Sequence, residues 1–184
     1  MQLYLASKSP RRRELLAEIV PHFEVEPSLF EESAKGLSAY ETVSLFSKEK
    51  AREVHARLGG VALGADTVVC LDGKILGKPR DKAEAAEMLR ALSGREHEVY
   101  TGVFLAGEKE FSAVVCTKVR FNTLSEELIQ LYIERENPLD KAGAYGIQDG
   151  YDLVASIEGS YTNVVGLPVE ETRALLKAHG GILC

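Results

Sequence analysis

The sequence has no hydrophobic stretch long enough to cross a membrane, and its first residues do not combine a basic region with an apolar signal core. We therefore expect no membrane partner and a cytoplasmic protein. Cysteine is scarce, and the three thiols show no Cys-x-x-Cys spacing; they are Cys70, Cys116 and Cys184. This argues against a disulfide framework or a zinc knuckle and favours reduced thiols.

Two glycine signatures of nucleotide-binding proteins are also missing. Neither Gly-x-x-x-x-Gly-Lys-Ser/Thr nor Gly-x-Gly-x-x-Gly occurs, which disfavours an ordinary nucleotide kinase. There is no excess of positive charge, because the net charge is -6 over 184 residues. A general nucleic-acid binder must neutralise many phosphates, so we expect no nucleic acid polymer as a partner. The four histidines lack metal-ligand spacing: His22, His55, His97 and His179.

Hydrophobic residues make up 45% of the chain, which is enough for the core of one domain. Their periodicity predicts strands at 3–6, 23–25, 61–71, 74–76, 97–106, 111–121, 152–157 and 161–165. It predicts helices at 10–20, 39–58, 81–92, 125–135 and 168–180. Because the two kinds of element interleave without strict alternation, we expect an α/β protein with a central mixed β-sheet flanked by helices.

A cationic segment lies where the first predicted strand turns into a helix. Leu5-Ala6-Ser7-Lys8-Ser9-Pro10-Arg11-Arg12-Arg13 places two serine hydroxyls and four cations there. Ser9 is a good N-cap and Pro10 suits the first helical turn, so free amides and the positive end of the helix dipole also lie at this point. The segment predicts a phosphate-binding site. Alone, so short a motif fits a solvated basic turn better.

Asp66 lies inside a nearly continuous apolar run, Ala62 to Cys70. An ionised carboxylate is costly there unless it is paired or bound to a metal, which favours a functional acid over a strand-end cap. Lys50 shares one face of the 39–58 helix with Phe46 and Val54. It either extends to the rim or supplies the cation that a buried carboxylate or phosphate needs.

Three weaker patterns add polar groups. Gly77-Lys78-Pro79-Arg80 lets backbone and an ammonium approach an anion together, and Glu31-Glu32 offers oxygen ligands to a divalent cation such as Mg²⁺. In Lys141–Gln148, small residues permit tight turns, and the Gln148 amide both donates and accepts, which suits recognition of a base edge. The alternatives are a solvated acidic loop and a simple glycine-rich connection. Asn163 could orient its neighbours in a second glycine-punctuated stretch.

Taken in order, five blocks resemble the Maf family along the whole chain. They are Leu5-Ala6-Ser7-x-Ser9-Pro10-Arg11-Arg12, Gly64-Ala65-Asp66-Thr67-Val68-Val69, Gly77-Lys78-Pro79, Lys141-Ala142-Gly143-Ala144-Tyr145-Gly146-Ile147-Gln148 and Gly159-Ser160-Tyr161-x-x-Val164-Val165-Gly166-Leu167-Pro168. The resemblance implies a single domain over residues 1–184, with an active-site cleft between two lobes and a fold related to the inosine triphosphate pyrophosphatases. It also implies metal-dependent release of pyrophosphate from a nucleoside triphosphate substrate.

The same resemblance implies roles for individual residues. Asp66 matches the proton acceptor that activates water, and Glu32 with Asp66 would associate with a divalent cation such as Mg²⁺, Mn²⁺ or Co²⁺. The residues that match the phosphate side are Ser7, Arg11, Arg12, Lys50 and Lys78. The residues that match the branch with a preference for dTTP and UTP are Arg11, Thr67 and Gln148. Family members are often dimers, so a homodimer is expected.

The chain departs from the family pattern at Asp149, where a glycine is usual. If that position has a positive φ, aspartate adopts it at some cost, and its carboxylate could alter substrate preference or metal behaviour. Lys8 and Arg13 fall outside the pattern and are expected to be solvated. Two other functions remain open: a phosphatase or nucleotide kinase that uses the same basic loop, and a non-catalytic nucleotide-binding regulator of septum formation.

Overall fold

The computed structural model describes residues 2–33 and 35–180. In this part of the chain one seven-stranded sheet has the order β2-β1-β3-β5-β6-β7, with β4 paired to β3. The strands are β1 (Leu3–Leu5), β2 (Glu24–Val25), β3 (Val61–Leu71), β4 (Lys74–Leu76), β5 (Glu96–Ala106), β6 (Phe111–Phe121) and β7 (Val154–Glu158). β1 runs parallel to β2 and β3, whereas the other pairs are antiparallel. The predicted mixed sheet is therefore confirmed.

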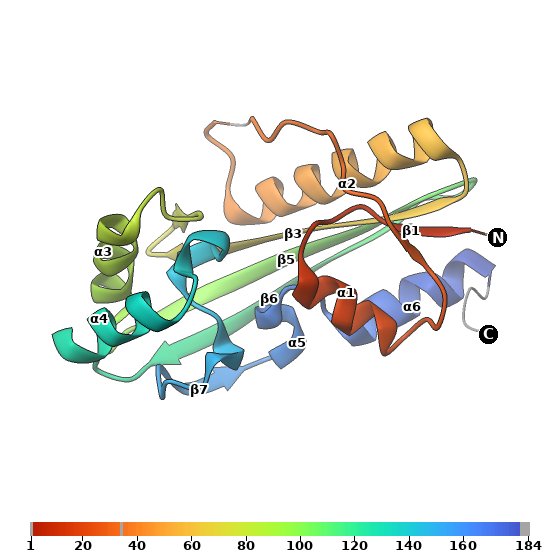
Figure 1. Ribbon diagram of the computed structural model, residues 1–184. Coiled ribbons are helices and arrows are strands. Elements are labelled where there is room, and N and C mark those ends of the chain that lie inside the picture. The colour runs from red at the N-terminus through yellow and green to blue at the C-terminus, as the bar shows by residue number, and fades with distance from the viewer. Residues whose placement is uncertain (1, 34, 181–184) are drawn as a thin grey trace.

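Helices cover both faces of this sheet (Figure 1). They are α1 (Pro10–Ala17), α2 (Ala39–Leu58), α3 (Lys82–Leu92), α4 (Glu126–Arg135), α5 (Tyr161–Val165) and α6 (Val169–Gly180), with short 3-10 turns η1 (Pro138–Asp140), η2 (Ala142–Ala144) and η3 (Ile147–Asp149). α2 lies across one face, and α1, α5 and α6 lie across the other (Figure 1). α3 and α4 lie at the end remote from β1 and α6 (Figure 1). The expected N-caps of α1, α3 and α4 are present, with Ser9, Asp81 and Ser125 each accepting a helix amide.

The segment Tyr161–Val165 is a helix, so its prediction as a strand was wrong. The β-branched residues Thr162, Val164 and Val165 favour a strand locally. Two boundary signals oppose this preference: Ser160 Oγ accepts the Asn163 amide as an N-cap, and Gly166 ends the helix with a φ of 131°. The capped turn therefore prevails over side-chain propensity.

The long strand β3 presents alternate residues to the two faces of the sheet. Val61, Leu63 and Ala65 pack in the core that includes side chains of α1 and α6. Ala62 and Val68 lie on the opposite face, under α2. By the same alternation Asp66 faces α2, whereas Thr67 faces the side of α1 and α5.

Two glycines allow α2 to lie directly on the sheet. A Cβ at Gly64 would lie 2.1 Å from the carbonyl oxygen of Ser47, far inside any real contact. At Gly102, which pairs with Asp66 across β3 and β5, a Cβ would lie 2.3 Å from the carbonyl oxygen of Val43. The backbone of α2 thus lies in close contact with the sheet beside Asp66.

One edge of β3 is interrupted. β5 pairs with β3 from Ala62 to Cys70 on one side, but on the other side β1 pairs only with residues 61–63 and β4 only with residues 69–71. Residues 64–68 therefore have no strand partner on that side within the described ranges; we call them the open edge of β3. On this side the Leu63 carbonyl accepts a hydrogen bond from the Ala6 amide. Because the backbone groups of successive residues in a strand point to alternate sides, the N–H and C=O groups of Ala65 and Thr67 point to the open edge.

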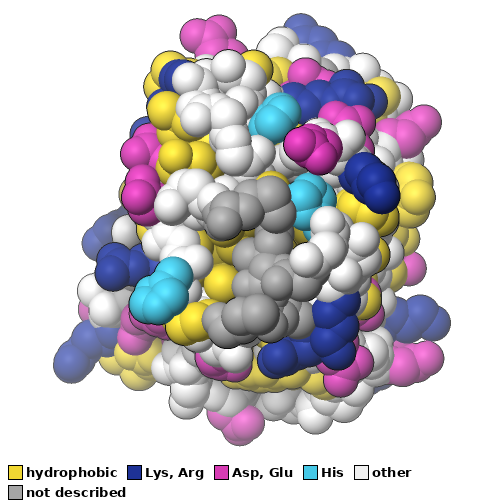
Figure 2. Space-filling view, turned by 90° about the vertical axis from the view of Figure 1, so that its right-hand side faces the viewer, with side chains coloured by type: hydrophobic (Ala, Val, Ile, Leu, Met, Phe, Trp, Pro, Cys, Tyr) yellow, Lys and Arg dark blue, Asp and Glu magenta, His cyan; other side chains and the backbone are white. Residues whose placement is uncertain are grey.

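The surface at the end where β1 begins and α6 ends shows basic and acidic side chains mixed together, with hydrophobic side chains between them (Figure 2). Among the helices of residues 2–33 and 35–180, none is long and apolar enough to cross a membrane. Cys70 is a buried free thiol and Cys116 an exposed one, whereas Cys184 lies outside the described residues.

Candidate active site

The open edge of β3 borders a cavity of about 510 Å³. A smaller hollow of about 320 Å³ adjoins it, and the two share lining residues: Ser9, Arg11, Arg12, Glu32, Lys50, Lys78 and Asp140. The larger cavity also contains Asp66, Thr67 and Gln148 in its wall, while Ser7 lines the smaller hollow. The residues to which the sequence assigned site roles therefore all line these two adjoining hollows, together called the depression, whereas Glu31, Arg80 and Asn163 line neither.

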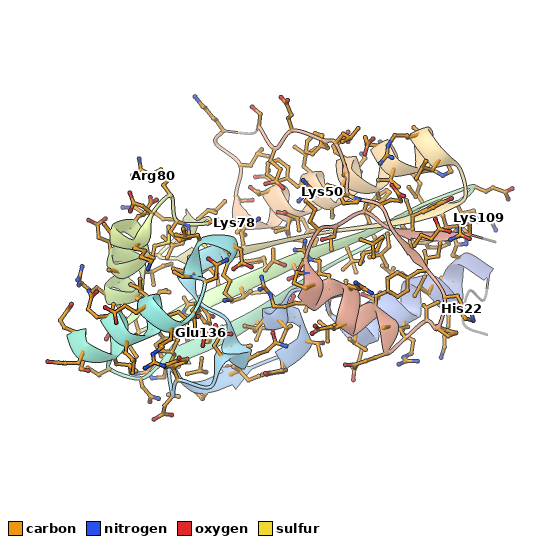
Figure 3. The ribbon with its side chains drawn as sticks, in the orientation of Figure 1. His22, Lys50, Lys78, Arg80, Lys109 and Glu136 are labelled. Atoms are coloured by element: carbon orange, nitrogen blue, oxygen red, sulfur yellow. The ribbon has the colours of Figure 1, made fainter. Side chains whose placement is uncertain are left out.

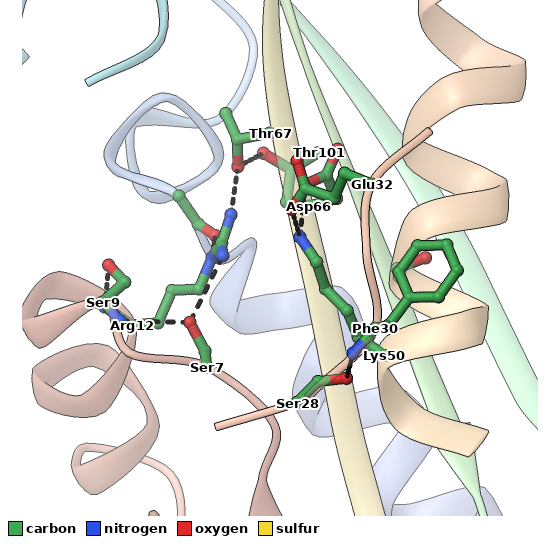
Figure 4. A network of polar contacts seen from close by, with 12 residues as sticks. Ser7, Ser9, Arg12, Ser28, Phe30, Glu32, Lys50, Asp66, Thr67 and Thr101 are labelled. Carbon is green, nitrogen blue, oxygen red and sulfur yellow. Dashed lines mark hydrogen bonds and ion pairs between the residues drawn. The ribbon is translucent and has the colours of Figure 1, made fainter. Parts of the chain in front are cut away.

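Lys50 joins two carboxylates at the centre of this depression (Figure 4). Its Nζ lies 2.7 Å from Asp66 Oδ1 and 2.5 Å from Glu32 Oε1. The side chains of Lys50 and Asp66 are only 13% and 10% exposed, whereas that of Glu32 is 50% exposed. Lys50 reaches this point from α2, and Lys78 comes from the segment after β4; His22 lies at the far end of the molecule (Figure 3).

Burial controls the acidity of Asp66. Removal from water raises the pKa of this carboxyl, the charges of Lys50 and Arg12 oppose that rise, and Glu32 adds to it. Oδ1 is occupied by Lys50, and Oδ2 has no hydrogen-bond partner among the described side chains. Asp66 therefore offers one free carboxylate oxygen with increased proton affinity to the cavity.

Arg12 connects α1 to the sheet and to α5. Its Nε donates to the Gly166 carbonyl at 2.9 Å, one terminal nitrogen donates to Ser7 Oγ at 3.3 Å, and the other to Thr67 Oγ1 at 3.0 Å. Burial lowers the pKa of Arg12, but a guanidinium stays charged in proteins. The side chain is thus a fixed cation in the wall of the cavity.

A chain of hydroxyl groups continues from Arg12 across the strands. Thr67 Oγ1 and Thr101 Oγ1 are 2.9 Å apart, and Thr101 donates to the Asn163 carbonyl at 3.0 Å. Since a hydroxyl has a single proton, Thr101 accepts from Thr67, and Thr67 accepts from Arg12. Every proton in this chain has a defined direction, which orients the guanidinium. Asn163 is fully buried and its amide nitrogen donates to the Val99 carbonyl and to Thr117, consistent with an orienting role.

Further cations lie at the rim of the site. Arg11 Nη1 lies 3.6 Å from Asp140 Oδ2, so α1 and η1 make an ion pair across the depression. Lys78 is exposed at the shared wall of the two hollows. Lys8 and Arg13 are exposed as expected, although Lys8 also lines the smaller hollow.

A further part of the cavity wall is formed by the glycine-rich segment. Tyr145, Gly146 and Gln148 line it, and Gln148 is exposed. The condition for strain at Asp149 is not met, because Asp149 is not among the residues with a positive φ and the positive φ of 79° belongs to Gly150. Aspartate is therefore accommodated in the η3 turn without backbone strain.

Sequence reasoning missed Thr101 and Asp140. Thr101 lies opposite Thr67 only because of the register between β3 and β5, which no local pattern encodes. Asp140 directly precedes the glycine-rich segment, and this proximity was the one available signal.

Glu32 and Asp66 form a pair of carboxylates that is suited to a divalent cation. Glu32 Oε1 and Asp66 Oδ1 both lie within hydrogen-bond distance of the Lys50 ammonium, so the two carboxylates converge on a common point. No group of three potential ligands among histidine, cysteine, aspartate and glutamate occurs in the described ranges. Mg²⁺ commonly uses one or two carboxylates together with water and substrate phosphates, which matches this donor set.

Fold and site together define an α/β protein with a cationic, acid-containing cleft at an interrupted sheet edge. The chain belongs to the Maf family, since the family model described as Maf-like protein matches residues 2–179. A protein of Carboxydothermus hydrogenoformans named dTTP/UTP pyrophosphatase is 51% identical over 98% of this chain and 100% of its own length. A protein of the same name from Thermococcus gammatolerans is 51% identical over 91% of each chain.

Solved structures give a more distant similarity. A nucleoside-triphosphatase, also named dITP/XTP pyrophosphatase, from Mycobacterium abscessus is 19% identical with a TM-score of 0.48, and covers 66% of this chain and 74% of its own. A HAM1 protein from Coxiella burnetii is 19% identical with a TM-score of 0.49, and covers 66% of this chain and 73% of its own.

Proposed function

We propose that this protein is a nucleoside triphosphate pyrophosphatase that converts dTTP and UTP to the monophosphates and pyrophosphate. The observation that carries the proposal is Asp66, a buried carboxylate that contacts Lys50 at 2.7 Å inside a cleft lined by cations and by the Gln148 residue. The names of the relatives from Carboxydothermus and Thermococcus support the choice of nucleotides.

In the proposed reaction, Asp66 is the general base. Its free Oδ2 accepts a proton from a water molecule, which attacks the α-phosphorus, so that pyrophosphate is the leaving group. The raised proton affinity that burial gives this carboxyl suits a base that works near neutral pH. Lys50 keeps the carboxylate oriented through Oδ1.

The cations that line the cleft would bind the triphosphate. Arg12 is held by three hydrogen bonds, so it presents its charge without further ordering. Arg11 and Lys78, together with Ser7, add donors around the shared wall of the two hollows. Thr67 and Gln148 line the cavity where the nucleoside would lie and would contribute to the preference for pyrimidines.

We assign Glu32 and Asp66 as the residues that would hold a divalent cation, with Mg²⁺, Mn²⁺ and Co²⁺ as candidates. When bound, such a cation supplies positive charge that offsets the charge of the phosphate oxygens.

The test is a panel of nucleoside triphosphates assayed with each of these cations, with separate detection of pyrophosphate and orthophosphate. We expect pyrophosphate from dTTP and UTP. Orthophosphate as the product would indicate a phosphatase, and binding without either product would indicate a regulator. A profile restricted to purines would contradict the pyrimidine assignment.

The role of Asp66 is tested by Asp66→Asn, which should lose at least ~100-fold in kcat because a general base is removed. Asp72→Asn is the matched control. Asp72 lies at the turn after β3, pairs with Arg95 outside the cavity and has a φ of 51°, which asparagine tolerates. Near-normal turnover by Asp66→Asn would refute the assignment.

A further inference from the structure

Asp149 is directed away from the cavity wall that its neighbours form. Gly146, Ile147 and Gln148 line the cavity, whereas Asp149 does not. Its Oδ2 accepts a short hydrogen bond from the Tyr132 hydroxyl, and its side chain is only 16% exposed. The carboxylate at the position where a glycine is usual therefore contacts the protein interior and does not line the cavity.

Tyr132 connects this carboxylate to the backbone of the same segment. The Gly146 amide donates to the Tyr132 hydroxyl oxygen at 2.9 Å, and that hydroxyl donates to Asp149. The Asp149 amide also donates to the Gly146 carbonyl at 3.1 Å. Since Tyr132 is fully buried in α4, the two residues that flank Ile147 and Gln148 are both attached to one fixed group.

Lys141 completes the arrangement at the beginning of the glycine-rich segment. Its Nζ lies 3.4 Å from Asp149 Oδ2 and donates to the Asn137 carbonyl at 3.0 Å, with a side chain only 9% exposed. Gly146 allows this contact, because a Cβ there would lie 2.8 Å from Asp149 Oδ2 and 3.0 Å from Lys141 Cε. Tyr132, Lys141 and Asp149 thus form one packed cluster around Gly146.

We infer that Asp149 is a positioning residue for nucleobase recognition: through Tyr132 and Lys141 it holds Tyr145–Gln148 in the form that lines the cavity. This inference rests on the proposed function for the identity of the ligand. Among the described residues, the side chains of Tyr132 and Asp149 make no hydrogen bond or ion pair with Lys50, Arg12 or Glu32, and Lys141 lies in the cavity wall next to Asp140. The cluster therefore affects how the base is held, and the step at the α-phosphorus is unchanged.

The test compares KM and kcat for dTTP, UTP and dATP in three variants: Asp149→Ala, Tyr132→Phe and the double variant. For each single variant we expect KM for dTTP and UTP to rise about tenfold, as for loss of a charged hydrogen bond, with kcat within about twofold. The preference for dTTP over dATP should fall by a similar factor. The double variant should cost less than the sum of the two single changes, because both single changes remove the hydrogen bond between Tyr132 and Asp149.

Two further variants separate positioning from a general loss of structure. Asp149→Asn keeps an acceptor for Tyr132 and should recover most of the lost affinity. Tyr100→Phe removes a matched tyrosine–carboxylate hydrogen bond, 3.1 Å from Tyr100 to Glu98, at a site outside the cavity lining, and should leave KM unchanged. Melting temperatures are measured for all variants, and Tyr132→Phe, which retains the ring, carries the test if Asp149→Ala does not fold.

Three results would overturn the inference: unchanged KM in both single variants, a fall in kcat alone, or additive costs in the double variant. If the unmodified protein releases no pyrophosphate, the proposed function fails, and the inference is then tested by binding of α,β-imido-dUTP. Weaker binding in Asp149→Ala and Tyr132→Phe, but not in Tyr100→Phe, supports it. Equal binding in all of these proteins refutes it.

Discussion

Replacing Gly64 with alanine is expected to separate Lys50 from Asp66 while the protein stays folded. The new Cβ would lie 2.1 Å from the Ser47 carbonyl oxygen and 2.7 Å from the Ala51 amide nitrogen, both in the backbone of α2. Because backbone atoms have no alternative rotamer, the helix itself must move. Lys50 lies between these two residues in α2, so it moves with them.

The size of the effect follows from these distances. Ordinary contact begins at 3.4 Å, so α2 must withdraw by roughly 1.3 Å at this level. A shift of that size breaks the 2.7 Å hydrogen bond between Lys50 and Asp66. Misplacement of a catalytic contact by about 1 Å can reduce the rate about 100-fold. Overpacking costs about 1–3 kcal/mol of stability, which lowers Tm by about 2–12 °C in a chain of this size.

The assay measures pyrophosphate release from dTTP together with Tm, and Gly73→Ala is the matched control. Gly73 lies in the turn between β3 and β4, where a Cβ meets nothing within 4 Å but the φ of 76° strains any side chain. We expect that variant to lose roughly 1 kcal/mol, or about 2–4 °C in Tm, with full activity.

Two results would refute the reasoning. Full activity in a folded Gly64→Ala protein would show that the contact between Lys50 and Asp66 does not matter for turnover. Equal loss of activity in both alanine variants would show that activity follows stability and not the position of α2.

Three other changes have defined outcomes. Lys50→Met removes the largest influence that lowers the pKa of Asp66, and since the base must be ionised, the acidic limb of kcat/KM should move to higher pH. Thr101→Val leaves the Thr67 hydroxyl without its acceptor and should lower the free energy of unfolding by about 1–3 kcal/mol in urea titrations. Burial lowers the pKa of His97 to about 4, so the unfolded state binds a proton first as the pH falls. Stability should therefore decrease by about 2 kcal/mol between pH 7 and pH 5, and His97→Gln should abolish this decrease.

Each of these three predictions would be contradicted by a specific result. An acidic limb that stays in place in Lys50→Met would mean that Asp66 is not the titrating base. Unchanged stability in Thr101→Val would mean that its hydrogen bonds are replaced by water. Equal unfolding free energies at pH 7 and pH 5 would mean that His97 is not held neutral.

Strong periodic patterns of hydrophobic residues were sufficient to predict most strands of the sheet. Val61–Leu71 and Phe111–Phe121 are strands over the predicted residues, and the turn at Asp72-Gly73 joins β3 to β4 as expected. Helix starts were predictable because capping is local: Ser9 and Asp81 each precede their helices with the expected hydrogen bond. The prediction of a strand at Tyr161–Val165 was wrong because it followed the β-branched side chains and not the helix caps at Ser160 and Gly166.

Some residues of the site could likewise be predicted from the local sequence, whereas others depend on long-range contacts. Asp66 was recognisable because a carboxylate in an apolar strand needs a partner, and Lys50 because it shares a helix face with hydrophobic residues. Their 2.7 Å contact depends on the close approach of α2 at Gly64, which the sequence alone does not indicate. Thr101 and the inward orientation of Asp149 likewise depend on strand register and on packing against α4, so they became visible only in three dimensions.

The open edge of β3 also bears on aggregation. An unpaired strand edge is ordinarily a template for association with another chain. Here the unpaired stretch is limited to residues 64–68, about 16 Å at the rise of a strand, and β1 and β4 occupy the same side at its two ends. An incoming strand would have to end within that interval, whereas a small molecule meets no such restriction. The protein can therefore keep backbone groups accessible at its site without exposing an edge that recruits a second polypeptide.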